Sequence, residues 1–132
     1  MTLGAYLRQV LVSDPGVAAL SQGRVYSEVL PQAPATPAVV FDVVSADEDL
    51  SLEGPTGVRR TSVAVDSWAE KRADATALGI AVRRVLSGHS GAAAGFEVQA
   101  VFFITERWAF DPDTGLYRTS QDYEVWASGE GI

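Results

Sequence analysis

Apolar and polar residues recur along this chain with two periods, one typical of helices and one typical of strands. Near the start, apolar residues recur at the spacing of one helix face, at Leu3, Tyr6, Leu7, Val10 and Leu11. They predict an amphipathic helix over residues 3–12. Asp14 followed by Pro15 resembles an N-cap and a first helical residue. The pair predicts a second, short helix that ends near Gly23.

The longest helical pattern covers residues 70–87. Its apolar positions form one predicted stripe, at Ala73, Ala77, Leu78, Ala81, Val82 and Val85. Gly88 follows as a C-terminal stop signal. The glycine- and alanine-rich stretch 88–95 is expected to be a flexible connector.

Period-two alternation predicts strands over residues 38–46, 59–68, 96–105 and about 116–127. Prolines at positions 31, 34 and 37 predict an extended connector before the first strand. A turn signal with Asp, Pro and Gly at residues 111–115 separates the last two strands. The acidic residues 47–58 form a loop in this interpretation, longer than the two to five residues that are usual for a hairpin.

These elements predict one α+β domain over residues 1–132. Its core is an antiparallel sheet of about four strands, made of two hairpins. One long helix and a short N-terminal helical segment pack on this sheet. Residues 47–58 extend from the domain as an arm, and the tail at 128–132 is expected to be frayed.

Composition agrees with a folded domain, since 47% of the residues are hydrophobic and 20% are charged. No apolar run approaches the roughly 18 residues that a membrane span needs. The N-terminus lacks the pattern of a signal peptide, so the expected compartment is the cytoplasm of a cell. The net charge of −7 disfavours sequence-specific DNA binding, because the basic residues are spread along the chain.

The sequence contains no recognisable catalytic, cofactor or metal site. Cysteine is absent, which excludes thiolate ligands and Cys nucleophiles. The only histidine, His89, precedes Ser90, but adjacent residues cannot adopt triad geometry and the nucleophile-elbow motif is incomplete. His89 is therefore expected to be a solvated loop residue. The acidic arm departs from a calcium loop, with Leu52 and Val58 where Gly and Glu are required. We expect no enzyme activity.

The arm and its flanks supply the candidates for a subunit interface. The arm is interpreted as either a polar hairpin tip or a segment that contacts a neighbouring subunit. The basic pair after the arm could meet its acidic residues within one subunit or across an interface. Trp108 is either a core residue or an interface anchor. The candidates are Asp47, Glu48, Asp49, Leu50, Leu52, Glu53, Arg59, Arg60 and Trp108.

Three motifs and their order resemble the tail completion, or tail terminator, proteins of long-tailed bacteriophages and gene transfer agents. The first is the short helix followed by Gly23-Arg24-Val25-Tyr26 and a Pro-flanked strand. The second is a strand that ends in Asp66-Ser67-Trp68 and leads into the Ala-rich helix. The third is the turn at 111–115 followed by Tyr117-Arg118 and a final strand. The resemblance covers almost the whole chain.

The resemblance implies a structural virion protein at the head-proximal end of the tail, assembled in the bacterial cytoplasm. Such proteins form a ring, typically of six subunits, on the last layer of the tail tube protein. The ring ends tail growth, joins the head connector or stopper protein, and lets DNA pass through its lumen. The alternative is another head–tail connector or neck adaptor without the terminator role. No cofactor, metal or membrane association is implied.

Overall fold

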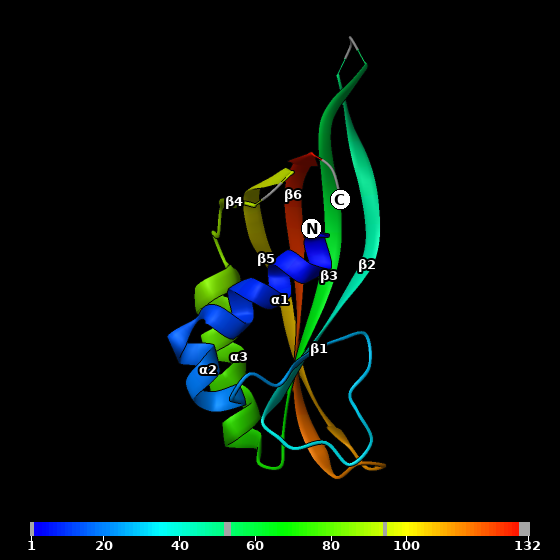
Figure 1. The fold of residues 1–132 in the computed structure, drawn as a ribbon. Helices are drawn as coiled ribbons and strands as arrows, with labels where there is room; N and C mark the ends of the chain where they lie inside the picture. The colour runs from blue at the N-terminus through cyan, green and yellow to red at the C-terminus, as the bar shows by residue number, and fades with distance from the viewer. Residues whose placement is uncertain (1, 52–53, 94, 130–132) are drawn as a thin grey trace.

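The computed structural model describes residues 2–51, 54–93 and 95–129, and it places three helices on one side of a six-stranded sheet (Figure 1). The helices are α1 (Leu3–Ser13), α2 (Pro15–Ser21) and α3 (Arg72–Leu86). The strands are β1 (Val25–Ser27), β2 (Ala38–Ser51), β3 (Gly54–Ala69), β4 (Gly91–Ala93), β5 (Phe96–Asp111) and β6 (Leu116–Gly129). Across the sheet the order is β1-β2-β3-β6-β5-β4.

This architecture shows that the expected fold class, about four antiparallel strands with one long helix, is wrong. The sheet is mixed, since β1 pairs in parallel with β2 while the remaining pairs are antiparallel. β1 and β4 are each only 3 residues long, too short for an alternating pattern to reveal them. β4 lies in the stretch that was expected to be a flexible connector, and most of the described chain is strand.

The acidic arm is a further correction, because it is largely paired strand rather than loop. β2 continues to Ser51 and β3 begins at Gly54, with Glu48 opposite Arg59. The last pair between β3 and β6 is Val58 with Ser128, so the described strands of the β2–β3 hairpin extend beyond the end of β6 (Figure 1). This ladder is held by backbone hydrogen bonds, which do not require an alternation of apolar and polar side chains. The sequence therefore gives no pattern from which these strands could be predicted. Of the tail that was predicted to be frayed, residues 128 and 129 belong to β6, and residues 130–132 lie outside the described residues.

The first two helices, α1 and α2, begin at side-chain caps. The Thr2 hydroxyl accepts a hydrogen bond from the Ala5 N–H at 3.1 Å, and the Asp14 carboxylate accepts one from Val17 at 3.0 Å. The helices bury their apolar faces against the covered side of the sheet. The core residues that they contribute include Leu3, Tyr6, Leu7, Leu11, Val17, Leu78, Val82 and Leu86.

The buried face of α3 differs from the predicted stripe. Ala73 and Ala77 are exposed, so the true contact face is rotated relative to the prediction. Small residues are weak markers of burial, because alanine is found on both helix faces. The face that meets the sheet consists of Ala75, Leu78, Gly79, Val82 and Leu86.

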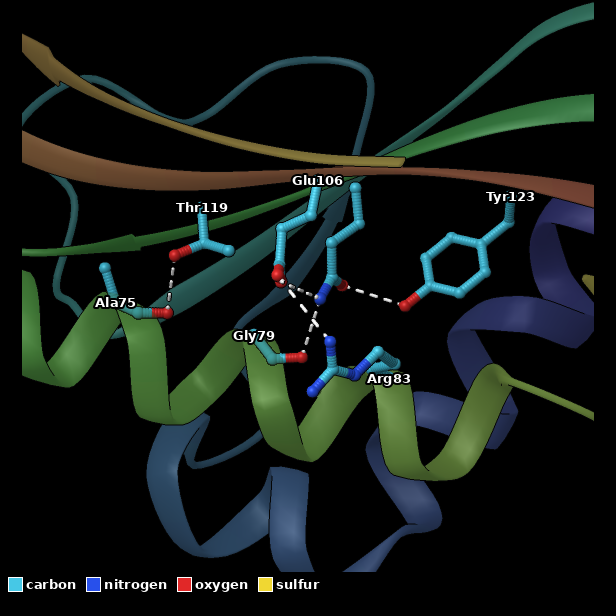
Figure 2. Close-up of polar contacts among 7 residues, drawn as sticks. Ala75, Gly79, Arg83, Glu106, Thr119 and Tyr123 are labelled. Carbon is cyan, nitrogen blue, oxygen red and sulfur yellow. Dashed lines mark hydrogen bonds and ion pairs between the residues drawn. The ribbon is translucent and has the colours of Figure 1, made fainter. Parts of the chain in front are cut away.

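A buried polar network joins α3 to β5 and β6 (Figure 2). The Gln121 amide donates to the Gly79 carbonyl at 2.9 Å and to the Glu106 carboxylate at 2.8 Å. Its amide oxygen accepts from the Tyr123 hydroxyl at 2.8 Å. Gln121 is fully buried, so each of these bonds satisfies a group that would be costly to leave unpaired. Burial raises the pKa of Tyr123, which keeps its hydroxyl protonated as a donor.

The network is flanked by two further contacts. The Thr119 hydroxyl donates to the Ala75 carbonyl at 3.0 Å, and Arg83 lies 3.6 Å from the Glu106 carboxylate. Between these two contacts, the backbone of α3 lies close to β6 at Gly79. A Cβ at this position would lie 2.7 Å from Cγ2 of Thr119, which is closer than packed carbon atoms allow. The position therefore requires glycine although it lies inside a helix.

We expect Gly79→Ala to destabilise the protein by about 1–3 kcal/mol through overpacking, despite the better helix propensity of alanine. Thr119→Ser removes the methyl group that the new Cβ would meet. The double variant should therefore regain much of the free energy of unfolding, as measured by urea denaturation. Additive losses in the double variant would contradict the proposed contact.

Candidate functional site

The sheet has one face covered by helices and one open face. Along β3, Val63 and Val65 point toward the helices and are 2% and 1% exposed. The alternate residues Ser62 and Ala64 point to the other side; Ser62 is exposed and Ala64 is half-buried. None of the described helices packs on this second face (Figure 1), so it is available for contacts outside the subunit.

The open face contains a shallow hollow of about 400 Å³. Apolar side chains stand at its two sides, with Val44 of β2 63% exposed and Ile104 of β5 56% exposed. Its lining residues are Val44, Ser45, Ser62, Val63, Ala64, Ile104, Asp122, Tyr123 and Glu124. Exposed apolar groups on a sheet are typical of a surface that another protein covers.

Two of the predicted interface residues meet on this open face at the base of the hairpin. Asp47 and Arg60 are cross-strand partners, and their side chains form an ion pair at 3.3 Å. The Arg60 guanidinium also lies over the Trp126 ring, 5.8 Å from its centroid. Trp126 in turn donates to Glu124 at 2.8 Å. Arg60 thus meets the acidic arm within one subunit, which is one of the two arrangements expected from the sequence, and its role in a subunit interface stays a prediction.

Arg59 points to the opposite face, because successive residues of a strand alternate in direction. It borders a smaller hollow of about 220 Å³ together with Thr2 and Val43, near the start of α1. The side chains of Arg59 and Arg60 therefore lie on opposite faces of the sheet, although the two residues are adjacent in the sequence.

The remaining arm candidates are described only in part. Glu48, Asp49 and Leu50 belong to the backbone of β2, where Glu48 is opposite Arg59. Leu52 and Glu53 lie outside the described residues. A role for these residues in subunit contact stays a prediction.

Trp108 lies toward the opposite end of the sheet, away from the arm residues. It is opposite Thr119 on β6 and borders a small space beside Arg72 at the start of α3. Its side chain is 51% exposed, as is that of Phe110, whose ring lies 4.9 Å from that of Tyr117. Trp108 is thus not a core residue, and it belongs to an aromatic group at this end.

His89 differs from the solvated loop residue that was expected. It is half-buried, and its Nε2 lies 2.6 Å from the Tyr6 hydroxyl. The two rings are in tilted contact at 5.7 Å between centroids. Burial lowers the pKa of His89 and raises that of Tyr6, so both groups are neutral at pH 7. The geometry favours a packing role for His89, joining the end of α3 to α1.

The described residues offer no group of three or more His, Cys, Asp or Glu side chains that could hold a metal ion. None of the helices in the described ranges is long and apolar enough to cross a membrane.

The exposed apolar residues of β5 are the surface feature that the sequence interpretation missed. Phe102, Phe103 and Ile104 are consecutive in the sequence. The Phe103 ring faces α3, where it contacts the Arg83 guanidinium, whereas Phe102 and Ile104 are exposed. A strand with apolar residues on both faces indicates that both are covered in the functional state. This signal was present in the sequence but was interpreted as simple alternation.

Comparison with known proteins gives a family and a fold. The family described as "Tail completion protein gp17" matches residues 5–128. A chain in the solved structure "Virion of native gene transfer agent (GTA) particle" has a TM-score of 0.77, with 22% identity over 97% of this chain and 96% of that chain. This second likeness concerns the fold alone. No curated protein matches the chain.

The environment of His89 predicts a pH dependence of stability. A base whose pKa is lower in the folded state than in the unfolded state binds fewer protons when folded, so the protein loses stability as pH falls below about 6.5. We expect a His89→Gln variant to lose this part of the dependence between pH 7 and pH 5. Since His89 is the only histidine, an NMR titration of its ring protons can measure its pKa directly. A value at or above that of an unfolded peptide would contradict the assignment.

Proposed function

The chain belongs to the family of tail completion protein gp17, a structural component of the virion, and from this premise we propose that it forms a ring on the tail. The ring contains six subunits and lies at the head-proximal end of the tail tube. There it ends polymerisation of the tube protein and presents a surface to the head connector or stopper protein. The particle is either a bacteriophage or a gene transfer agent.

The observation that carries the ring proposal is the β2–β3 hairpin. It extends past the last β3–β6 pair at Val58 and Ser128, and so reaches beyond the body of its own subunit (Figure 1). The contacts of Arg60 with Asp47 and with the Trp126 ring join the base of the hairpin to β6. A projecting segment that is ordered at its base is suited to contact a neighbour, because less conformational entropy is lost on binding.

Net charge supports the proposed passage of DNA. The chain carries a charge of −7, and on the open face Asp42 and Glu124 add negative charge to the ion pairs of Asp47 with Arg60 and of Asp122 with Arg107. A surface with net negative charge repels the phosphate backbone of DNA and offers no sequence-specific contacts. In a conduit, this repulsion allows the duplex to slide.

The chemistry of the described residues supports a structural role over a catalytic one. The His89 ring contacts the Tyr6 ring, and its Nε2 lies within hydrogen-bond distance of the Tyr6 hydroxyl. This nitrogen is therefore engaged in packing α1 against the end of α3. The buried polar residues Gln121 and Glu106 are occupied by contacts with α3. Their positions contribute to the fold, and neither side chain lines the hollow on the open face.

Shortening the hairpin tests the proposal. Replacing residues 49–58 by Asn-Gly would place a two-residue turn between the cross-strand partners Glu48 and Arg59. We expect the variant to fold, because the core residues of β3 begin at Thr61. Circular dichroism and a cooperative melt within a few degrees of wild type would show this. Negative-stain microscopy with purified tail tubes should show capped tube ends for wild type and uncapped ends for the variant.

The outcomes separate the possible roles. Wild-type protein that stays monomeric and does not bind tube ends would contradict the terminator role. Binding to the head connector without capping of tubes would favour the neck adaptor alternative. Normal capping by the shortened variant would show that the hairpin tip is dispensable for assembly.

A further inference from the structure

The long strands β2 and β5 are only partly covered at their outer edges by the short strands β1 and β4. β1 pairs with β2 only at Val39, Val40 and Phe41, and β4 pairs with β5 only at residues 96–98. The Gly88 N–H extends this cover by one bond to the Val101 carbonyl. Within the described residues, no strand pairs with the outer edge of β2 over 42–51 or of β5 over 102–111. We call these the free stretches.

The free stretches also carry almost all of the exposed apolar side chains. Apart from Val29, every large hydrophobic residue that the described structure leaves exposed lies on one of them. On β2 these are Val43 and Val44, and on β5 they are Phe102, Ile104, Trp108 and Phe110. An unpaired strand edge bordered by apolar side chains is a template for pairing with another chain. Lysine and proline, two of the residues that protect such edges in monomeric proteins, are absent from both free stretches.

The directions and positions of the two free stretches allow them to pair with each other in different subunits. β2 and β5 run in opposite directions, because three antiparallel pairings separate them in the sheet. One free stretch extends toward the hairpin tip, and the other extends toward the turn that follows Asp111 (Figure 1). Pairing would therefore be antiparallel and staggered. A closed barrel of strands requires such a stagger, since its strands tilt from the axis.

Charge favours contact between unlike stretches over contact between two copies of the same one. The free stretch of β2 carries four acidic residues and no basic residue; the acidic residues are Asp42, Asp47, Glu48 and Asp49. On β5, Glu106 is turned toward α3 and Asp111 accepts bonds within its own turn. Arg107 is the one basic residue of the two free stretches; it forms an ion pair with Asp122 at 2.7 Å, and its side chain stays 58% exposed. Two β2 stretches would repel one another, whereas β5 offers the acidic β2 stretch a basic side chain.

We propose that the free stretch of β2 pairs with the free stretch of β5 in a second copy of this chain, so that the sheets join into one continuous sheet around the assembly. The proposal rests on the ring proposed above and assigns its subunit seam. Two different edges meet at each seam, so the contact is heterologous and closes under cyclic symmetry. The exposed apolar side chains on the two stretches are then covered by the neighbouring subunit.

Cross-linking between single-cysteine chains tests the seam. The chain has no native cysteine, so Ser45→Cys on β2 and Ala109→Cys on β5 provide unique thiols at exposed positions. The two variants, carrying different tags, are mixed, assembled on tail tubes and treated with a short bismaleimide. We expect a cross-linked heterodimer in the mixture and none from either variant alone. Ala19→Cys on α2, also exposed, replaces Ser45→Cys in the control mixture and should give no product.

A second pair of variants tests whether the apolar residues of the seam are needed. Ile104→Lys places a charge on a side chain that is 56% exposed, so the monomer should fold with an unchanged melting temperature. We expect the yield of rings to fall at least about tenfold, as for the loss of a central interface residue. Val29→Lys changes the exposed hydrophobic residue that lies outside the free stretches, and it should assemble as wild type does.

The results distinguish failure of the seam from failure of the ring. Rings that form without the heterodimer product, or that tolerate Ile104→Lys, would overturn the seam and leave the ring intact. A product from Ser45→Cys alone would indicate that like edges meet, which also overturns it. If wild-type protein neither forms rings nor caps tubes, the proposed function fails and the seam fails with it.

Discussion

The contact of α3 with β6 is the constraint on which the rest of the structure depends. Gln121 is buried on the covered face of the sheet, and its amide must be satisfied there. The helix provides a backbone carbonyl at Gly79, and β5 provides the carboxylate of Glu106. Because the helix can come this close only where it has no side chain, one glycine fixes both the depth and the rotation of α3.

This constraint determines which face of the sheet is left open. α1 and α2 pack beside α3, so their apolar residues join the core on the covered side. No further helix remains among the described residues to cover the second face. The open face is consequently built from cross-strand polar pairs, such as Asp47 with Arg60 and Arg107 with Asp122. Its exposed apolar residues stand at the two margins of the sheet rather than at the centre.

The sequence predicts this structure well where side-chain burial sets the pattern. The helices that form α1 and α2 were located by their periodicity and their N-caps, and these predictions are confirmed. The parts that failed are held by backbone hydrogen bonds, which have no side-chain signature. They include the short edge strands, which carry no periodicity, and the acidic hairpin, which has no buried face to reveal its register. The site shows the same division, since charge predicted the contact of Arg60 with Asp47 but could not place Arg59 on the opposite face.

The shape of the sheet depends on register shifts in its strand pairing, which cannot be predicted from the pattern of side chains. The pairings of β2 with β3 and of β5 with β6 each have two register shifts, while the inner pair of β3 with β6 has none. One shift from each pairing lies at the same level, after Val43 in β2 and after Phe103 in β5, because these residues are linked through the paired residues Val63 and Tyr123. An extra residue in each outer strand lengthens the margins relative to the centre and increases the local twist. The sheet therefore curls along its whole width, and this curvature is what a subunit needs if its margins are to meet those of its neighbours around an axis.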